Sequence, residues 1–327
     1  MDQLMIQDIN EHLINRIYNR YPFIHLNDLG GFHNMVYSTE YKKDDYILRI
    51  TDRSHRSYKE IESEVSFLKY LEEKGVPVYK FILLHKMKTD LHVYYLTTFK
   101  KALGYEWFEI NLDETTYYNT GRILGLLHYW SQRNKRFYER SPFDQNVYFK
   151  EAHKVLEPQF NIYLKTLLKE INQIPKNQNN YGLIHGDYHF ANLIYQSRED
   201  MTIIDFDDCE YNFYLYDIAV YLFYYLLGPN PSVIDYEKNQ LIFHYFIKGY
   251  LSILPIDESM FSYLPLFLKL REIKLYISLL LHNNSDSLSN WRLKYLKRTE
   301  QNLLNNQPFI DIDYNEWFKE VIKTIIV

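Results

Sequence analysis

Three polar side chains, Asp187, Asn192 and Asp205, constrain this chain more than any other feature. They are five and thirteen residues apart, and each lies beside a short apolar segment, which predicts loops between short strands. A rigid scaffold can present catalytic groups from such loops. One carboxylate can accept the proton of a hydroxyl, while an amide and a second carboxylate hold magnesium against nucleotide phosphates. The spacing therefore predicts phosphoryl transfer, with Asp187 as the catalytic group and Asn192 and Asp205 as magnesium ligands.

Each of these residues also has a simpler structural interpretation. Asp187 could cap its own turn, Asn192 could be a loop amide, and Asp205 could cap the end of a strand. The three residues occur together at these spacings, however, and a motif in its expected context carries more weight than any member alone. The functional interpretation is therefore favoured.

The bulk composition narrows the classes of protein. With 327 residues, 46% hydrophobic and 24% charged, the chain is typical of a soluble globular protein. A formal net charge of −5 gives no support to nucleic-acid or anionic-membrane partners. The single cysteine, Cys209, excludes an intrachain disulfide, and the polar N-terminus does not resemble a secretory signal. The apolar stretch 213–227 contains Asp217 and is too short to cross a bilayer. We expect a cytoplasmic location and no membrane association.

Extended segments come first along the chain and long helical patterns come last, which predicts two lobes with a boundary near residues 99 to 105. We expect an N-terminal nucleotide-binding lobe over residues 1–99 and a helical catalytic and substrate-binding lobe over residues 100–327. The expected strands cover residues 36–41, 46–50, 92–99, 182–184 and 201–204. The expected helices cover residues 1–18, 57–74, 115–130, 152–171, 213–227, 236–253, 260–282 and 288–304, with Pro265 at the true start of the seventh.

At these motifs the chain resembles the aminoglycoside phosphotransferase and choline kinase-like enzymes, which are relatives of the protein kinases. The loop pattern H-G-D-x-H-x-x-N of that group is present as His185, Gly186, Asp187, His189 and Asn192. The metal motif I-D-F/W-x-D/E is present as Ile204, Asp205, Phe206, Asp207 and Asp208, and the downstream D-hydrophobic-A as Asp217, Ile218 and Ala219. The resemblance implies an α+β, two-lobed protein kinase-like fold, with a small β-rich N-lobe and a larger, mostly helical C-lobe.

The resemblance also implies a set of nucleotide-binding residues in the N-terminal part. The turn that contains Gly31 and Asn34 stands where the group covers the phosphates, although the full G-x-G-x-x-G pattern is missing. Arg49 stands where many kinases carry a phosphate-facing lysine, and Glu64 stands where the group pairs that cation with a helical glutamate. Backbone near Phe99 would meet the adenine. The alternative for Arg49 is an exposed strand residue paired with a surface acid.

Two histidines in the motif have two interpretations. His185 and His189 are four residues apart, a spacing that can bind metal when both lie on one helix. The glycine between them argues against a helix, and in the family resembled here these histidines shape the catalytic loop. Asp217 would tether the same loop from the following helix. Asp207 and Asp208 extend the acidic cluster, where Asp207 would help arrange a second metal or only the loop, and Cys209 has no identified base partner.

The function that we predict is magnesium-dependent transfer of the γ-phosphate of ATP, with GTP as the alternative nucleotide, to a hydroxyl of a small molecule. The resemblance suggests an amino alcohol, an amino acid or an aminoglycoside as the acceptor. Aromatic side chains of the later helices could surround a cationic amine, or could simply pack the helices together: Tyr221, Tyr224, Tyr225, Tyr245, Tyr276 and Trp291. Two other classes stay open, a metal-dependent hydrolase and a catalytically silent nucleotide-binding regulatory protein.

Overall fold

The structure is a computed structural model that describes residues 14, 15, 17, 24–31, 34–89, 92–228, 230, 233–282 and 290–325. It divides into two compact units, Met1–Leu103 and Gly104–Val327. The helix predicted over residues 1–18 falls outside the described residues, apart from three helical positions between Ile14 and Ile17. The lobe boundary predicted after residue 99 stays a prediction. Each unit is described by itself.

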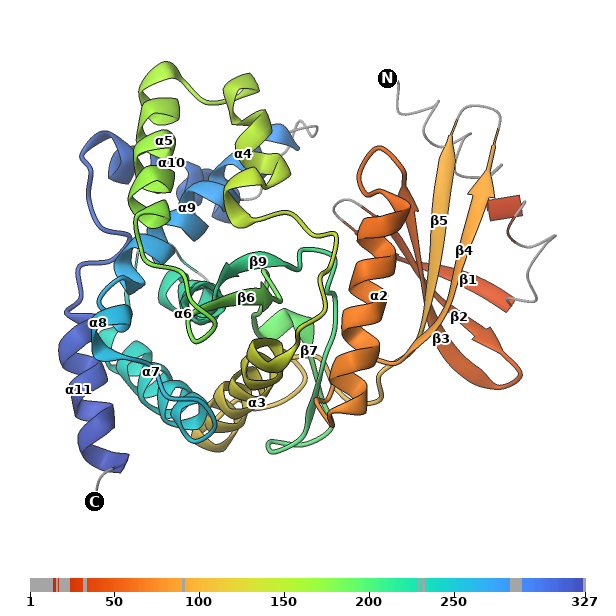
Figure 1. The fold of residues 1–327 in the computed structure, drawn as a ribbon, viewed down its shortest axis with the longest axis horizontal. Helices are drawn as coiled ribbons and strands as arrows, with labels where there is room; N and C mark the ends of the chain where they lie inside the picture. The colour runs from red at the N-terminus through yellow and green to blue at the C-terminus, as the bar shows by residue number, and fades with distance from the viewer. Residues whose placement is uncertain are drawn as a thin grey trace. The chain divides into compact units, whose positions relative to one another are not determined.

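The first unit is built on one antiparallel sheet whose strand order is β1-β2-β3-β5-β4 (Figure 1). One helix, α2, connects β3 to β4. Ser57 caps α2 by accepting a hydrogen bond from the Glu60 backbone, and the Glu60 side chain accepts one from the Ser57 backbone. The elements are β1 (Ile24–Gly30), β2 (Met35–Tyr41), β3 (Asp44–Asp52), α2 (Tyr58–Glu73), β4 (Phe81–Lys88) and β5 (Val93–Lys100).

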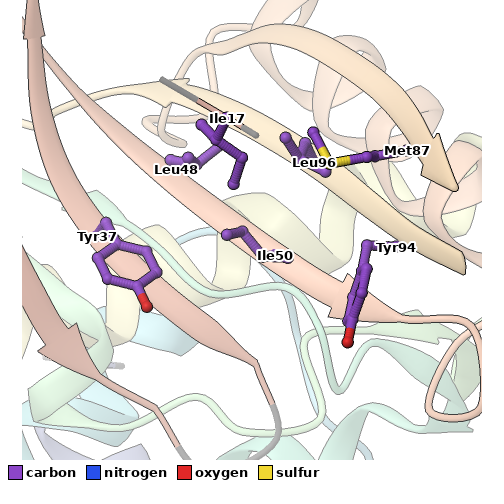
Figure 2. Packing of buried hydrophobic residues seen from close by; sticks show 7 residues of the cluster. All are labelled: Ile17, Tyr37, Leu48, Ile50, Met87, Tyr94 and Leu96. Atoms are coloured by element: carbon purple, nitrogen blue, oxygen red, sulfur yellow. The ribbon is translucent and has the colours of Figure 1, made fainter. Parts of the chain in front are cut away.

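Side chains alternate between the two faces of this sheet, as the period of a strand requires. Leu48 and Ile50 of β3 point to one face and pack there with Leu96 of β5 in a buried cluster (Figure 2). The remaining buried members of that cluster are Ile17, Tyr37, Met87 and Tyr94. Arg49 lies between Leu48 and Ile50 in the sequence, so its side chain points to the opposite face, where it meets α2 through Glu64. The alternation thus places one charged residue of a central strand inside the unit.

The second unit is mostly helical, with two small two-stranded sheets, β6-β9 and β7-β8, that hold the motif region (Figure 1). Helix α3 packs along α7, and α6 packs on α9. The helices are α3 (Glu114–Arg133), α4 (Val147–Glu151), α5 (Pro158–Asn172), α6 (Tyr214–Leu227), α7 (Tyr236–Leu251), α8 (Glu258–Phe261), α9 (Leu264–Leu281), α10 (Asn290–Leu304) and α11 (Tyr314–Ile325). The strands are β6 (Tyr181–Ile184), β7 (Leu193–Tyr195), β8 (Met201–Ile203) and β9 (Glu210–Phe213), and short 3₁₀ turns cover Phe143–Gln145, Ala152–Lys154 and Phe190–Asn192.

Several predicted elements differ from the structure. The helix predicted over residues 152–171 is wrong at its start, because Pro158 lacks an N–H and fits only the first turn, where α5 begins. The predicted start of a helix near Pro265 is confirmed by α9. The elements expected from the sequence do not include β1, β4, β7, β9, α4 or α11. Within the described part of the chain, no helix has both the length and the apolar character that crossing a membrane requires.

Candidate active site

The loop that carries Asp187 leaves β6 at Ile184 and continues through residue 192 to β7. Gly186 turns it sharply with a φ of +82°, and a Cβ at this position would lie 2.2 Å from the backbone oxygen of Asp208. Only glycine accepts both conditions without strain. The glycine of the motif therefore lets the loop pass close to the segment after Asp205.

Asp187 is held on both carboxylate oxygens. Arg271 of α9 donates to Oδ1 at 2.5 Å, and the Asn192 amide donates to Oδ2 at 3.2 Å. The Nε2 atom of His189 lies 3.4 Å from Oδ2, while its Nδ1 accepts the Ala191 backbone N–H, so Nε2 carries the hydrogen. The Asp187 side chain remains 25% exposed. It is thus fixed in direction and still reachable from solvent.

These neighbours determine the charge of Asp187. Burial by itself would raise the pKa of this carboxyl, but Arg271 and then His189 outweigh burial and hold the pKa well below its ordinary value. The carboxylate is therefore ionised throughout the neutral range. A carboxylate of low pKa is a good hydrogen-bond acceptor for a hydroxyl but a weak base.

The orientation of the Asn192 amide follows from its partners. Its Nδ2 donates to the backbone oxygen of Asp187 at 2.9 Å as well as to the carboxylate, which identifies the nitrogen and leaves Oδ1 as an acceptor with no hydrogen bond to the residues that the structure describes. The Asn192 backbone oxygen accepts the Ile204 N–H at 3.0 Å, next to Asp205. Pairing of β7 with β8 continues the same contact, with Leu193 opposite Ile203. The structure thus brings Asn192 beside the segment that carries Asp205.

Asp205 is exposed and has a φ of 60°, a left-handed conformation that non-glycine residues rarely adopt. Such strain is common at functional sites because surrounding contacts have to maintain it. The Asp205 carboxylate and the Asn192 amide oxygen are hard oxygen donors of the type that magnesium prefers, and magnesium usually takes one or two protein carboxylates together with substrate phosphates. The donor set present here fits that ion.

Asp217 fixes the start of the catalytic loop from α6. Its Oδ2 accepts the His185 backbone N–H at 2.8 Å, and its Oδ1 accepts the Gly186 N–H at 2.8 Å. The fully buried His128 of α3 lies with Nε2 3.1 Å from the same Oδ2 and with Nδ1 2.9 Å from the Tyr250 hydroxyl. Burial lowers the pKa of His128 more than Asp217 raises it, so the ring is neutral. Sequence spacing gave no signal for His128, which lies 89 residues from its partner.

His185 connects the catalytic loop to the metal motif. Its Nε2 donates to the Ile204 backbone oxygen at 2.9 Å, and its Nδ1 accepts the Asp187 N–H at 3.2 Å. Burial lowers its pKa, so this ring is also neutral. Both nitrogens of His185 and of His189 have protein partners, which disfavours the hydrolase alternative. Among the residues described, no three His, Cys, Asp or Glu side chains gather into a group that could hold a metal.

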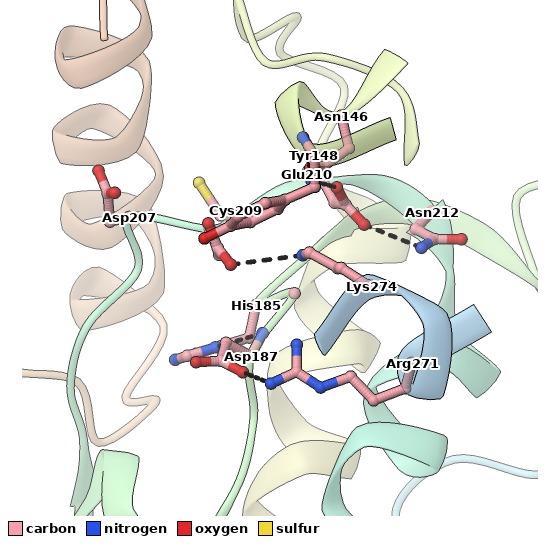
Figure 3. Close-up of polar contacts among 12 residues, drawn as sticks. Asn146, Tyr148, His185, Asp187, Asp207, Cys209, Glu210, Asn212, Arg271 and Lys274 are labelled. Carbon is pink, nitrogen blue, oxygen red and sulfur yellow. Dashed lines mark hydrogen bonds and ion pairs between the residues drawn. The ribbon is translucent and has the colours of Figure 1, made fainter. Parts of the chain in front are cut away.

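Two buried cations of α9, Arg271 and Lys274, were not predicted from the sequence. Arg271 pairs with Asp187, and Lys274 lies one turn further along α9 (Figure 3). Arg271 also donates a hydrogen bond to the Tyr224 hydroxyl. The Lys274 ammonium is 3.3 Å from Asp208, and its side chain is 2% exposed. Burial alone would lower the pKa of Lys274, but Asp208 raises it above the ordinary value. Both cations therefore stay charged and neutralise acids that the motif contributes.

The segment after Asp205 has a further anchor. Arg140 donates through Nε to the Cys209 backbone oxygen at 2.6 Å and through Nη2 to the Asp207 backbone oxygen. Arg140 and Asp207 are both buried, and so is Cys209. Arginine contacts with backbone oxygens fix the path of the metal motif without using its carboxylates.

In the first unit, Arg49 and Glu64 form the predicted pair. The Arg49 Nη2 lies 2.7 Å from Glu64 Oε2, and the two side chains are 5% and 0% exposed. The Tyr79 hydroxyl also donates to Glu64, at 3.4 Å. The alternative interpretation of Arg49 as an exposed strand residue is wrong, because β3 is a central strand whose alternation points Arg49 toward α2.

The other nucleotide-binding candidates of this unit lie near the two ends of its central strands. Gly31 has a φ of +148°, and a Cβ there would lie 2.0 Å from the Asn34 backbone oxygen, so the turn requires glycine. The Asn34 side-chain oxygen is buried without a hydrogen-bond partner in the described structure. The Phe99 ring is 1% exposed and stacks on Tyr79 at 4.1 Å, so the ring itself is closed to a ligand.

Comparison with known proteins gives one match to a protein family and several relatives. The sequence model of the "phosphotransferase enzyme family" matches residues 27–245. The amicoumacin kinase of Bacillus subtilis (strain 168) is 28% identical over 305 residues, which cover 88% of this chain and 89% of that protein.

Solved structures with the same fold are also kinases. The amicoumacin kinase hAmiN, in complex with AMP-PNP, Ca2+ and Ami, superposes with a TM-score of 0.82 at 24% identity, covering 97% of both chains. A microcompartment-associated aminopropanol kinase has a TM-score of 0.72 at 22% identity, covering 90% of this chain and 98% of its own. These similarities confirm the predicted α+β, protein kinase-like fold class.

Proposed function

The chain belongs to the phosphotransferase enzyme family, and from that premise we propose that it transfers the γ-phosphate of ATP, with magnesium, to a hydroxyl of a small molecule. Membership confirms the predicted family and the predicted phosphotransferase activity. The observation that carries the residue assignments is the environment of Asp187, an ionised and partly exposed carboxylate held by Arg271 and Asn192.

In this proposal Asp187 accepts a hydrogen bond from the hydroxyl of the acceptor and directs its oxygen at the phosphorus. Phosphoryl transfer passes through a loose transition state in which the attacking oxygen gains little positive charge until late. A strong base is therefore unnecessary, and the low pKa of Asp187 fits a group that orients the hydroxyl first and takes its proton late. Alignment and charge neutralisation would supply most of the rate.

Asn192 Oδ1 and the Asp205 carboxylate are the groups that we assign to magnesium. Magnesium, when bound, neutralises charge on the phosphate oxygens. The Oδ1 atom, which accepts no hydrogen bond from the residues that the structure describes, supports the assignment of Asn192, and the exposed, left-handed conformation supports that of Asp205. His185, His189 and Asp217 support this arrangement through the hydrogen bonds described above and have no chemical role in the transfer.

We assign the nucleotide phosphates to Arg49, steadied by Glu64, and to the turn around Gly31 and Asn34. A buried glutamate that uses one oxygen on Arg49 fixes the direction of the guanidinium, and arginine offers a planar fork to phosphate oxygens. Backbone near Phe99 is assigned to adenine. ATP is favoured over GTP because the similar hAmiN structure contains AMP-PNP, an adenine nucleotide.

The acceptor belongs to the class of small hydroxylated molecules. The relatives named for amicoumacin and for aminopropanol support this class, since both names denote small-molecule kinases. We place the reaction in the cytoplasm, where ATP is available and where a chain with one cysteine and no intrachain disulfide is usual.

The test is the thermal stability of the purified protein with magnesium plus ATP, with magnesium plus GTP, and without nucleotide. We expect a magnesium-dependent rise with ATP that is lost in Asp205→Ala and kept in Asp200→Ala, a control at an exposed acid near the same strand. A shift of equal size in both variants would contradict the metal assignment. The absence of any shift with millimolar nucleotide would contradict the proposed function.

A further inference from the structure

A group of aromatic rings in the second unit is not among the residues assigned above to the phosphoryl transfer. We call it the ring surface, and it consists of Trp107, Phe108, Phe190, Tyr224 and Tyr225. The Trp107 ring lies 4.7 Å from that of Phe190, which in turn lies 6.1 Å from Tyr224 and 5.1 Å from Tyr225. The members come from three separate segments: the loop before α3, the catalytic loop and α6.

The outer part of the ring surface is open to solvent. Trp107 is 40% and Phe108 65% exposed, and the neighbouring Tyr105 is 57% exposed. Large apolar side chains grouped on a surface indicate a binding site more often than isolated ones do. Phe190, Tyr224 and Tyr225 are partly exposed as whole residues, while the Tyr225 hydroxyl is buried.

The loop that presents Trp107 is held in place. Tyr105 exchanges two backbone hydrogen bonds with Tyr195 of β7, at 2.8 and 2.9 Å. The next turn is closed by the Glu109 N–H bound to the Glu106 oxygen at 2.9 Å, and by the Glu109 carboxylate bound to the Glu106 N–H at 2.8 Å. Exposed rings on an anchored loop form a preorganised contact, which lowers the entropic cost of binding.

The ring surface leads directly to Asp187. Phe190 lies three residues after Asp187 in the same loop, and the His189 ring, which contacts Asp187, lies 4.4 Å from Tyr224. Tyr224 accepts a hydrogen bond from Arg271, the residue that also holds the Asp187 carboxylate. A molecule that stacked on Phe190 and Tyr224 would therefore have its next few atoms beside the Asp187 carboxylate.

Charges at the inner end of this surface disfavour a polycationic ligand. The Arg271 guanidinium lies 5.1 Å from the Tyr224 ring centroid and already neutralises Asp187. Lys274 is a second cation on the same side of α9 and already pairs with Asp208. At the outer end, the Glu109 carboxylate accepts a hydrogen bond from the Glu106 backbone N–H. Of the two acids in that turn, only the Glu106 carboxylate is then left to attract a cation. Apolar stacking is the interaction that the rings themselves offer.

We infer that the acceptor of the proposed transfer carries a flat, unsaturated ring, which stacks on Trp107, Phe190 and Tyr224 while its hydroxyl meets Asp187. The contact between the acceptor hydroxyl and Asp187 rests on the proposed function, whereas the stacking of the ring does not. From the sequence, the aromatic side chains were considered as a cage around a cationic amine. The inference is instead that they recognise the flat shape and the unsaturation of a ring.

The test uses four probes on the full chain with magnesium and AMP-PNP. Phenylalaninol and alaninol differ only by a phenyl group, cyclohexylalaninol has a saturated ring of similar size, and kanamycin is a polycation without a flat ring. Binding is measured by saturation-transfer NMR, which also reports which protons of the probe touch the protein. The variants are Trp107→Ala and, as a matched control, Phe137→Ala, an exposed ring elsewhere in the same unit.

We expect phenylalaninol to bind about tenfold or more tightly than alaninol, with its ring protons most strongly saturated and with cyclohexylalaninol weaker. Trp107→Ala should remove this preference, while Phe137→Ala should keep it. Equal binding of phenylalaninol and alaninol, a preference that survives Trp107→Ala, tightest binding of kanamycin, or no binding of any probe would each overturn the inference. The thermal shift with magnesium and ATP is recorded in parallel, so its loss would be recognised separately as failure of the proposed function.

Discussion

Two arginine–carboxylate pairs, one in each unit, have similar geometry and different surroundings. Arg49 and Glu64 lie 2.7 Å apart with side chains that are 5% and 0% exposed. Arg271 and Asp187 lie 2.5 Å apart, but Asp187 is 25% exposed. In the first pair the carboxylate is enclosed and the arginine is the group assigned to a ligand. In the second pair the arginine is enclosed and the carboxylate is the group assigned to a ligand.

The difference teaches what each pair can do. A charge sealed from water depends on its partner for stability, so the enclosed Glu64 can only support Arg49. A partly exposed carboxylate keeps access to solvent and substrate, so Asp187 can exchange one hydrogen-bond partner for another. The same contact is thus a support in one unit and part of the proposed chemistry in the other.

Breaking the enclosed pair should have the largest effect on stability. Glu64→Gln removes the carboxylate charge that the buried Arg49 guanidinium meets at 2.7 Å, and breaking such a buried pair costs about 3–5 kcal/mol of unfolding free energy. Urea unfolding measures the change, and the apparent affinity for ATP should also fall because Arg49 loses its direction. Glu62→Gln, at an exposed position of the same helix, is the control. A loss below about 1 kcal/mol for Glu64→Gln would show that this pair behaves as an exposed one.

Breaking the open pair should cost less stability and change the pH dependence. Arg271→Met should cost about 1–3 kcal/mol, because water can reach Asp187. Asp187 has a depressed pKa, so its contribution to stability is present above its ordinary pKa and lost as the pH falls through the folded-state value. Without Arg271 that pKa rises, and the acid limb of kcat/KM should move to higher pH.

The control for Arg271→Met is Lys269→Met, which removes a cation of the same helix that contacts Asn306 instead of Asp187. For Lys269→Met, the fall of kcat/KM at acid pH should occur at the same pH as in the wild type. A limb that stays unchanged in Arg271→Met would mean that Arg271 does not set the charge state of Asp187.

A smaller effect is expected from the histidine behind the catalytic loop. The folded protein keeps His128 neutral, whereas the unfolded chain takes up a proton below about pH 6.5, so stability falls as the pH drops. This slope is at most about 1.4 kcal/mol per pH unit for one histidine. His128→Gln should reduce the slope between pH 7 and pH 5 in urea unfolding, and the exposed His153→Gln should not. Parallel slopes in all three proteins would contradict a buried, neutral His128.

The two pairs also differ in how far the sequence could predict them. Arg49 and Glu64 are 15 residues apart, on a strand and the helix that follows it, and each has a place in the order of family landmarks. Local spacing likewise located Asp187, Asn192 and Asp205, because one short segment carries all three.

Arg271 is 84 residues from Asp187, on a helix whose pattern is mostly apolar. Nothing in that pattern distinguishes a cation aimed at the catalytic loop from one that extends to solvent, since both interrupt an apolar face in the same way. The same reason hid His128, Arg140 and Lys274. Their partners are set by the packing of α3, α9 and the loop before α4 around the motif, which spacing within one segment does not encode. The start of the helix predicted over residues 152–171 was wrong for a local reason. The apolar pattern continues across Pro158, but proline fits only the first turn of a helix, so α5 begins there.

The most direct test of the central claim is Asp187→Asn, measured for phosphate transfer to an acceptor and for binding of magnesium and ATP in the same preparation. Asparagine keeps the size of the side chain and can still contact Asn192, but it cannot accept the proton of a hydroxyl. We predict that kcat falls by about 10²–10⁴-fold while the thermal shift with magnesium and ATP is retained. Transfer at the wild-type rate, or equal loss of transfer and nucleotide binding, would contradict the role assigned to Asp187.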